Sequence, residues 1–240
     1  MRLDRFLSET GLGTRSQVKA LLKTGQVSID GKVAKNGKTQ VDPLKTSVAY
    51  QGEVLHYQKF YYYLLNKPQG VLSATRDPKQ KTVLDLLRAD DYRKDLFPVG
   101  RLDKDTEGLL LLTNDGKLAH ELLSPKKHVD KEYYAKIAGV VAPAMIDKFA
   151  LGFLIDGDEK VRPSELVIEK TDPAKNTSEI RLTIREGKFH QVKRMFEAFG
   201  MTVTYLKRTR MGRLALGDDL QLGEYRPLSE DEVGRLGERE

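Results

Sequence analysis

The sequence predicts an α+β protein of two domains, and three features of its 240 residues support this fold class. Short segments with helical apolar spacing are interspersed with segments of strand character along the chain. After residue 60, the mixture of short strands and helices favours a mixed, largely antiparallel sheet flanked by helices. A change of composition near residue 56, with no internal repeat on either side, predicts domains of residues 1–59 and 60–240.

The first domain is expected to contain two short helices and a hairpin. Their apolar positions are Leu3, Phe6 and Leu7 in the first helix and Val18, Leu21 and Leu22 in the second. The first helix ends near Gly11, and the second begins at Thr14, which forms a capping-box pattern with Gln17. The second helix stops before Gly25, and the following segment QVSIDGKVAKNG alternates around an Asp-Gly turn, which predicts a tight hairpin.

Positive charge is concentrated in this first domain. Residues 1–60 hold ten Lys and Arg against five Asp and Glu, although the net charge of the whole chain is only +6. Arg15, Lys19 and Lys23 are four residues apart and therefore lie on one exposed stripe of the second helix. Such a stripe beside a basic hairpin can follow a phosphate backbone without reading bases, so RNA is the expected partner. The alternative is an ordinary solvated face of a soluble protein.

The second domain is expected to alternate strands and helices in a fixed order. The expected elements are a strand in FYYYLLN, a helix in TVLDLL, a strand in GLLLLTND, a helix in GKLAHELLS, a strand in KEYYAKIAG, a helix from Pro143 to Leu151, neighbouring strands in SELVIEK and SEIRLTIRE, a helix in HQVKRMFEAFG and a strand in TVTYLKRTRMG. Ile180, Leu182 and Ile184 alternate onto one face of the second of the neighbouring strands. The acidic, polar tail from Ser229 onward is expected to be partly disordered.

Several kinds of chemistry are excluded by what the sequence lacks. It has no cysteine, which removes thiol nucleophiles, disulfides and thiolate metal sites. It also lacks a phosphate-binding glycine loop, a serine-hydrolase elbow and histidines at metal-ligand spacing, so no cofactor and no metal are expected. No apolar run approaches the roughly 20 residues that span a bilayer, and the N-terminus does not resemble a secretory signal, so a cytoplasmic protein without membrane attachment is predicted.

The densest group of polar residues is the segment GRLDKDTEGLLLLTNDG, residues 100–116. Its polar turn carries Arg101, Asp103, Asp105 and Thr106 directly before the four leucines of an expected buried strand. A carboxylate at the edge of the core can be partly desolvated and still face a cleft. For an isolated Asp103, a simple turn or cap role is the alternative interpretation.

These residues resemble a known family. GRLDxDTxGLLLLTNDG is similar to the signature of RNA pseudouridine synthases, in the branch that modifies ribosomal RNA and carries an N-terminal S4 domain. The first 50 residues resemble that S4 RNA-binding domain. LNKPQG, KEY and EGKFHQVKRMF then follow in the family's order, and the resemblance extends from Arg2 to about Leu228. It implies isomerisation of uridine to pseudouridine, a reaction that needs no redox cofactor or group donor.

The resemblance implies that Asp103 is the catalytic carboxylate, which either attacks ribose C1′ or removes a proton from C2′. Both routes require an ionised carboxylate in a site that largely excludes water. Because burial alone raises the pKa of a carboxyl group, a cation is expected beside it. Lys193 is the first candidate, and Arg194 remains an alternative because many relatives have arginine at the position of Lys193. Lys193 could instead pair with Glu197 on its own helix.

Two further site residues come from the same resemblance, and Arg101 is added from its place in the polar turn. Tyr133 is expected to stack on the target uracil after the nucleotide flips out. Its neighbour Tyr134 is expected to point to the opposite face of the strand, into the core. Leu206 is expected to form an apolar wall beside the carboxylate, and ordinary packing in the core is the alternative interpretation. Arg101 positions the turn or contacts a phosphate of the RNA.

The implied partner is ribosomal RNA or a small-subunit assembly intermediate, bound by a monomer. The short N-terminal extension, LNKPQG and the ending GEYRPLSEDE are most similar to the branch that modifies one uridine of 16S rRNA. The alternatives are a large-subunit 23S rRNA pseudouridine synthase and a non-catalytic S4-domain protein of ribosome assembly. A pure RNA-binding protein has no need of Asp103, Tyr133 and Lys193 together, so an enzyme is favoured.

Overall fold

The computed structural model describes residues 1–124, 127 and 129–236 and divides the chain into two compact units, Met1–Phe60 and Tyr61–Glu240. The sequence placed the division one residue earlier, after residue 59. Each unit has a hydrophobic core of its own. Within the described residues, no helix has the length and apolar character needed to cross a membrane.

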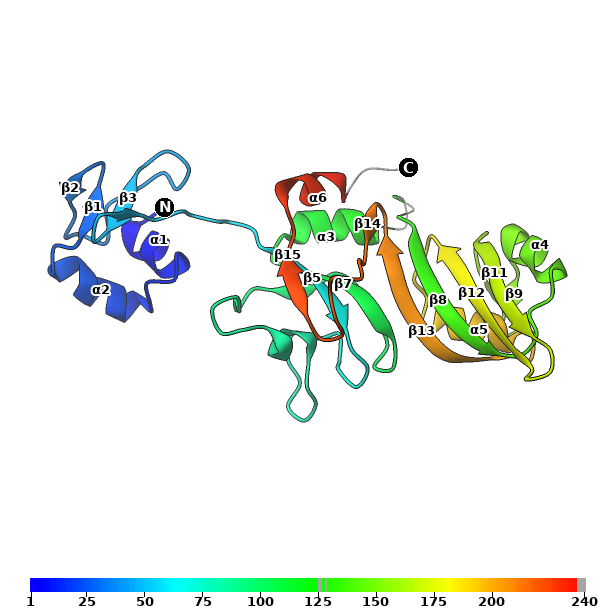
Figure 1. The fold of residues 1–240 in the computed structure, drawn as a ribbon. Coiled ribbons are helices and arrows are strands. Elements are labelled where there is room, and N and C mark those ends of the chain that lie inside the picture. The colour runs from blue at the N-terminus through cyan, green and yellow to red at the C-terminus, as the bar shows by residue number, and fades with distance from the viewer. Residues whose placement is uncertain (125–126, 128, 237–240) are drawn as a thin grey trace. The chain divides into compact units, whose positions relative to one another are not determined.

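The N-terminal unit packs two helices against a small sheet with the strand order β2-β1-β3-β4 (Figure 1). Its elements are α1 (Leu3–Glu9), α2 (Arg15–Lys23), β1 (Val27–Ile29), β2 (Lys32–Val33), β3 (Val48–Tyr50) and β4 (Glu53–Val54). The capping box at Thr14 and Gln17 is present, which confirms the predicted start of α2. Asp30 and Gly31 both have positive φ, as a tight hairpin turn requires, so the predicted hairpin is also confirmed.

The second unit is built on one large mixed sheet with the strand order β11-β12-β8-β13-β7-β5-β15 (Figure 1). Its elements are β5 (Tyr62–Lys67), η1 (Val83–Leu86), β6 (Phe97–Pro98), β7 (Glu107–Thr113), α3 (Gly116–Leu123), β8 (Lys131–Ala138), α4 (Ala144–Leu151), β9 (Leu154–Ile155), β10 (Glu159–Lys160), β11 (Glu165–Asp172), β12 (Thr177–Ile184), α5 (Gln191–Glu197), β13 (Thr202–Met211), β14 (Leu214–Ala215), β15 (Tyr225–Pro227) and α6 (Glu230–Arg235). Strands β7 and β13 pair in parallel, and the other described pairs are antiparallel, so the predicted sheet type is confirmed.

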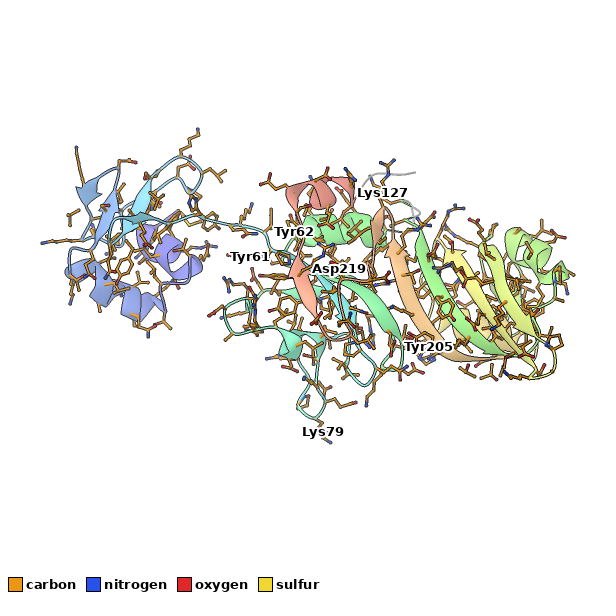
Figure 2. All side chains as sticks on the ribbon, viewed as in Figure 1. Tyr61, Tyr62, Lys79, Lys127, Tyr205 and Asp219 are labelled. Carbon is orange, nitrogen blue, oxygen red and sulfur yellow. The ribbon has the colours of Figure 1, made fainter. Side chains whose placement is uncertain are left out.

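Strand β7 is buried along its whole length because core side chains cover both faces of the sheet here. Leu110 and Leu112 pack into one cluster with residues of α5, and Leu109 and Leu111 pack into another with residues of α3. Both faces of a strand with four consecutive leucines are thereby removed from water, as the sequence predicted. Tyr62, labelled in Figure 2, links β5 to this layer by donating a hydrogen bond to Asp115, the N-cap of α3 (2.8 Å).

The parallel contact between β7 and β13 requires a glycine. Gly108 has a φ of +101°, and a Cβ atom at this position would lie 2.2 Å from the backbone oxygen of Arg208. One residue before it, Glu107 accepts a hydrogen bond from the hydroxyl group of Tyr205 (2.6 Å), which is labelled in Figure 2. Strand β13 is therefore fixed directly beside the point where the polar turn of residues 101–106 enters the sheet.

Three expectations need correction. TVLDLL forms only one 3₁₀ turn, η1. Thr82 and Asp85 form a capping box at its start, and the backbone is extended again at Leu87, which ends the turn. Tyr134 does point away from the face of Tyr133, but it is half-buried and donates to Glu179 instead of entering the core. The tail is not disordered from Ser229: Ser229 caps α6, and Arg226 binds Glu232 at 2.7 Å. The expectation for residues 237–240 lies outside the described residues.

Candidate active site

Asp103 lies on a loop that is held from beneath by a buried lysine. Lys67, the last residue of β5, is fully buried. Its ammonium group donates to the carbonyl oxygens of Pro68 (3.0 Å), Asp103 (3.1 Å), Lys104 (3.4 Å) and Thr106 (2.9 Å). Burial lowers the pKa of Lys67 to about 8, although the nearby carboxylates, Asp105 foremost, partly oppose this shift. The positive charge of Lys67 therefore lies inside the loop, although its desolvation costs free energy.

Hydrogen bonds with Gly70 and Ser73, in the segment after Pro68, complete the support of this loop. The N–H of Gly70 donates to the carbonyl oxygen of Lys104 (2.8 Å). The hydroxyl group of Ser73 donates to the carbonyl oxygen of Leu102 (2.8 Å) and accepts from the N–H of the same residue (3.0 Å). LNKPQG thus shapes the loop that carries Asp103 and contributes no described side chain to the cleft in front of it.

A cleft opens in front of Asp103 on the face of the sheet that carries α5. Its lining residues are Arg101, Leu102, Asp103, Thr106, Tyr133, Ile184, Gly187, Lys188, His190, Gln191, Val192 and Leu206. Tyr133 comes from β8 and is only 8% exposed, and Leu206 comes from the adjacent β13. Four of the residues selected from the sequence, Arg101, Asp103, Tyr133 and Leu206, therefore meet in one cleft although they are spread over 106 positions of the chain.

Lys193 reaches Asp103 from α5. Its Nζ lies 3.4 Å from Oδ2 of Asp103, and it binds both carboxylate oxygens of Asp105 at 2.7 and 2.9 Å. Burial opposes the charge of Lys193, but the hydrogen bond to Asp105 and the charge of Asp103 outweigh it and raise the pKa of the lysine. The hydrogen bond from Lys193 also holds the pKa of Asp105 below its usual range. A stable ammonium ion is therefore shared by two carboxylates.

The structure separates the two candidates for the cation. Arg194 turns away from Asp103: its Nε binds Oδ2 of Asp156 (2.6 Å), and its Nη2 binds Glu159. These contacts attach α5 to the β9–β10 hairpin. The alternative pairing of Lys193 with Glu197 on its own helix is not found among the contacts of the described residues. The described partners of Lys193 are the two loop carboxylates, Asp103 and Asp105.

Among the residues of this region that were not selected from the sequence as site residues, the most informative are Lys67, Asp105, His190 and Gln191. His190 Nε2 lies 3.6 Å from Oδ1 of Asp103, whereas Lys193 faces the other carboxylate oxygen, Oδ2. Gln191 closes the preceding loop, because its side chain accepts from the N–H of Lys188 (2.9 Å) and donates to Glu186 (2.7 Å). In the sequence, these residues are marked only by their presence in the segments LNKPQG and EGKFHQVKRMF and in the polar turn.

Metal-binding geometry is not found in this region. Among the residues that the structure describes, no three His, Cys, Asp or Glu side chains are grouped so that they could hold a metal ion. Asp103 and Asp105 both face the ammonium group of Lys193.

In the N-terminal unit, Arg15, Lys19 and Lys23 are exposed along α2, as the helical spacing predicted. Arg15 and Lys19 line a polar pocket together with Met1, Arg2, Asp4 and Arg5. Arg2 and Arg5 are engaged by Asp4 and Glu9. In the described part of the chain, no ion pair involves a member of the stripe.

Comparisons with known proteins cover both units. The RNA pseudouridylate synthase family model matches residues 61–198, and the S4 domain model matches residues 1–43. An uncharacterized RNA pseudouridine synthase of Bacillus subtilis is 52% identical over 238 residues, 99% of either chain. Ribosomal small subunit pseudouridine synthase A of Escherichia coli K12 is 39% identical over 98% of this chain and 100% of that protein. A crystal structure of a pseudouridylate synthase aligns with a TM-score of 0.67 at 36% identity, over 98% of this chain and 99% of that one.

Proposed function

The chain belongs to the RNA pseudouridine synthase family, and from this premise we propose that it isomerises one uridine of 16S ribosomal RNA with Asp103 as the catalytic carboxylate. One observation carries the assignment of the residue. Asp103 lines a cleft together with Tyr133 and Leu206 and has an ammonium group 3.4 Å from its carboxylate. A turn or cap residue needs none of these neighbours.

The reaction breaks the bond from uracil N1 to ribose C1′ and forms a bond from C5 to C1′. The proton on C5 is lost and N1 gains one, so the product is an isomer and no outside reductant or donor takes part. Asp103 serves either by attacking C1′ or by taking a proton from C2′. Lys193 places its ammonium group 3.4 Å from the carboxylate in both routes, where it can hold the side chain of Asp103 in position.

The remaining lining residues hold the uracil. An everted base can stack on the ring of Tyr133, and the side chain of Leu206 limits the cleft on the side of β13. Arg101 is exposed at the same cleft and is suited to contact a backbone phosphate. Once the base fills this small cleft, little room for water remains around Asp103.

The choice of substrate is supported by the relatives. The proteins of Escherichia coli and Yersinia pestis that are 39% and 40% identical to this chain are named ribosomal small subunit pseudouridine synthase A. The stripe of Arg15, Lys19 and Lys23 is suited to hold the RNA backbone. In this proposal the protein acts in the cytoplasm as a monomer, on 16S rRNA or on an assembling small subunit.

The decisive test is Asp103→Asn. The amide cannot act as a nucleophile or base, so we expect conversion of a 16S rRNA transcript to fall by about four orders of magnitude in single-turnover assays. Its Kd for the same RNA should remain within about threefold of wild type, because the change is nearly isosteric. If the Asn variant converts uridine at the wild-type rate, Asp103 is not the catalytic group.

The substrate is tested separately by mapping pseudouridines in total ribosomal RNA from cells with and without the protein. We expect loss of a single modification in 16S rRNA. Loss in 23S rRNA would assign the protein to the large subunit, and unchanged maps would favour the non-catalytic RNA-binding alternative.

A further inference from the structure

Phe189 is a large aromatic residue whose exposure neither the fold nor the proposed chemistry explains. Its side chain is 75% exposed, at the end of the loop that leads into α5. The residues on either side of it, Lys188 and His190, both line the cleft of Asp103, but Phe189 itself does not. Single exposed apolar residues are common on protein surfaces. Phe189 differs from such residues because it lies beside the cleft and because its loop is held in place by hydrogen bonds.

The ring of Phe189 stacks on the ring of His190, which contacts Asp103 through its Nε2 atom. The centroids of the Phe189 and His190 rings are 3.7 Å apart, and the ring planes are inclined by only 19°. The Nε2 atom of His190 lies 3.6 Å from the carboxylate of Asp103. The sequence of groups is therefore carboxylate, imidazole and phenyl ring. With 75% of the side chain exposed, the phenyl face turned away from His190 is open to a further planar group.

The loop holds this ring in place before any substrate binds. His190 has a left-handed backbone conformation with a φ of 46°, which an L-residue seldom adopts and which sets the direction of Phe189. Nη1 of Arg194 donates to the carbonyl oxygen of Phe189 (3.0 Å). Arg194 is in turn fixed by Asp156 and Glu159, and the side chain of Gln191 closes the loop from within. An exposed ring that is already ordered loses little entropy when it binds a partner.

We propose that Phe189 is a stacking platform for an unpaired base of the substrate RNA, that of a nucleotide beside the one held in the cleft. The inference rests on the proposed function, since it takes the target nucleotide to lie at Asp103. When a nucleotide is everted, its neighbours lose a stacking partner, and a fixed ring beside the cleft replaces it. Every base has a π-face, so the platform accepts any of the four bases and contributes affinity, not base choice.

The surroundings favour RNA as the occupant. Arg101 is exposed at the same cleft, and Lys104 is exposed on the loop that carries Asp103, so an RNA strand at this cleft would meet positive charge. Lys188 neutralises Glu159 (2.9 Å), which reduces the repulsion that this carboxylate exerts on a phosphate. A base that stacks on Phe189 therefore belongs to a strand whose backbone is attracted to the same region.

The test compares Phe189→Ala, Phe189→Leu and Phe189→Trp on a 16S rRNA transcript. We expect KM to rise about 5- to 100-fold for Ala and Leu, the range that the loss of one stacked base predicts, with kcat within about threefold of wild type. Trp should retain the wild-type KM. The matched control is Leu151→Ala, which removes an equally exposed apolar side chain (77%) at the end of α4. Thermal stability should change in none of the four.

Stacking is measured directly with 2-aminopurine placed 5′ or 3′ of the convertible uridine in a short RNA, using Asp103→Asn protein to prevent turnover. One of the two positions should be quenched on binding, and the quenching should disappear when Phe189→Leu is added. An unchanged KM for Phe189→Ala, or quenching that persists without the ring, overturns the platform. If the platform fails these tests while Asp103→Asn is inactive, the proposed function stands without the platform. If Asp103→Asn still converts uridine, the assignment of Asp103 as the catalytic group fails instead.

Discussion

Arg15, Lys19 and Lys23 of the N-terminal unit project from one helix face into solvent, whereas the ammonium groups of Lys67 and Lys193 in the second unit are each surrounded by protein oxygen atoms. The first group has no described carboxylate partner in an ion pair. The second group holds a loop with two carboxylates, Asp103 and Asp105, in place.

The comparison distinguishes charged groups suited to bind RNA from charged groups that shape the candidate active site. Exposed charges act on RNA through the counterions that they displace, so their effects are roughly additive and weaken with salt. Charges at the cleft are close, partly desolvated and mutually dependent, so removal of one changes the state of the others. The following three changes test this contrast, beginning with the largest expected effect.

Lys67→Met should give the largest loss. The change leaves several buried carbonyl oxygens without a donor at about 1–3 kcal/mol each, and relief of the buried charge offsets part of this cost. We expect a net loss of about 2 kcal/mol in the free energy of unfolding, measured by urea denaturation, and a rate of conversion reduced about 100-fold because the loop of Asp103 loses its shape. A variant that is destabilised but converts RNA at the wild-type rate would show that the loop does not need this support.

The pH dependence of stability gives an independent check on Lys67. Its pKa of about 8 in the folded protein lies below the ordinary 10.5, so between these values the unfolded chain binds more protons. The free energy of unfolding should therefore rise with pH from 8 to 10.5, by up to about 3 kcal/mol for this group. Lys131 adds a similar rise, since burial also lowers its pKa to about 8. Lys67→Met should remove only the Lys67 part.

Charge reversal at all three stripe positions, Arg15→Glu, Lys19→Glu and Lys23→Glu, comes next. We expect Kd for a 16S rRNA transcript to rise about 10- to 100-fold, and the slope of log Kd against log salt to fall by about 2, because roughly three phosphate contacts are lost. The rate at saturating RNA should not change.

The matched control for the stripe is reversal of three exposed lysines of the second unit, Lys148, Lys170 and Lys175, which gives a similar change in net charge. Its Kd and salt slope should stay close to wild type. Equal effects from both triple variants would mean that total charge, and not the helix stripe, governs binding.

Asp105→Asn is expected to have the smallest effect of the three. Asp105 is 67% exposed, so stability should change by less than about 1 kcal/mol. The amide no longer competes for Lys193, which can then bind Asp103 more tightly and reduce its reactivity. We expect kcat to fall about tenfold without a change in KM, and Asp105→Glu to recover most of it. Equal rates for wild type and Asn would show that Asp105 has no part in placing Lys193.

The sequence predicted the local elements well because local rules determine them. The capping box at Thr14, the Asp30-Gly31 turn and the burial of Leu109 to Leu112 each follow from spacing within a few residues. The helix that begins at Glu230 was not predicted, because composition was weighed there instead of local spacing. Its acidic composition suggested disorder, but a cap at Ser229 and an ion pair to Arg226 stabilise it.

Within the site, the sequence could identify residues but not their arrangement. Asp103, Tyr133 and Leu206 were selected through the family resemblance, and the fold places them together in one cleft. The pairing of Lys193 with Asp105, 88 positions away, depends on how α5 packs on the sheet. Lys67 was overlooked because a lysine at a turn is ordinarily solvated, and only the tertiary structure reveals that carbonyl groups surround it.

The ammonium group of Lys67 occupies the kind of oxygen cage in which other proteins trap a dissolved potassium ion. In this protein the cation is the ammonium group of Lys67, which four methylene groups attach to the polypeptide. It therefore cannot exchange with the medium or be removed by a chelator. Loop geometry at Asp103 should therefore be the same in sodium, potassium or ion-poor buffer, and any dependence of the overall reaction on electrolyte can be traced to how the RNA is captured.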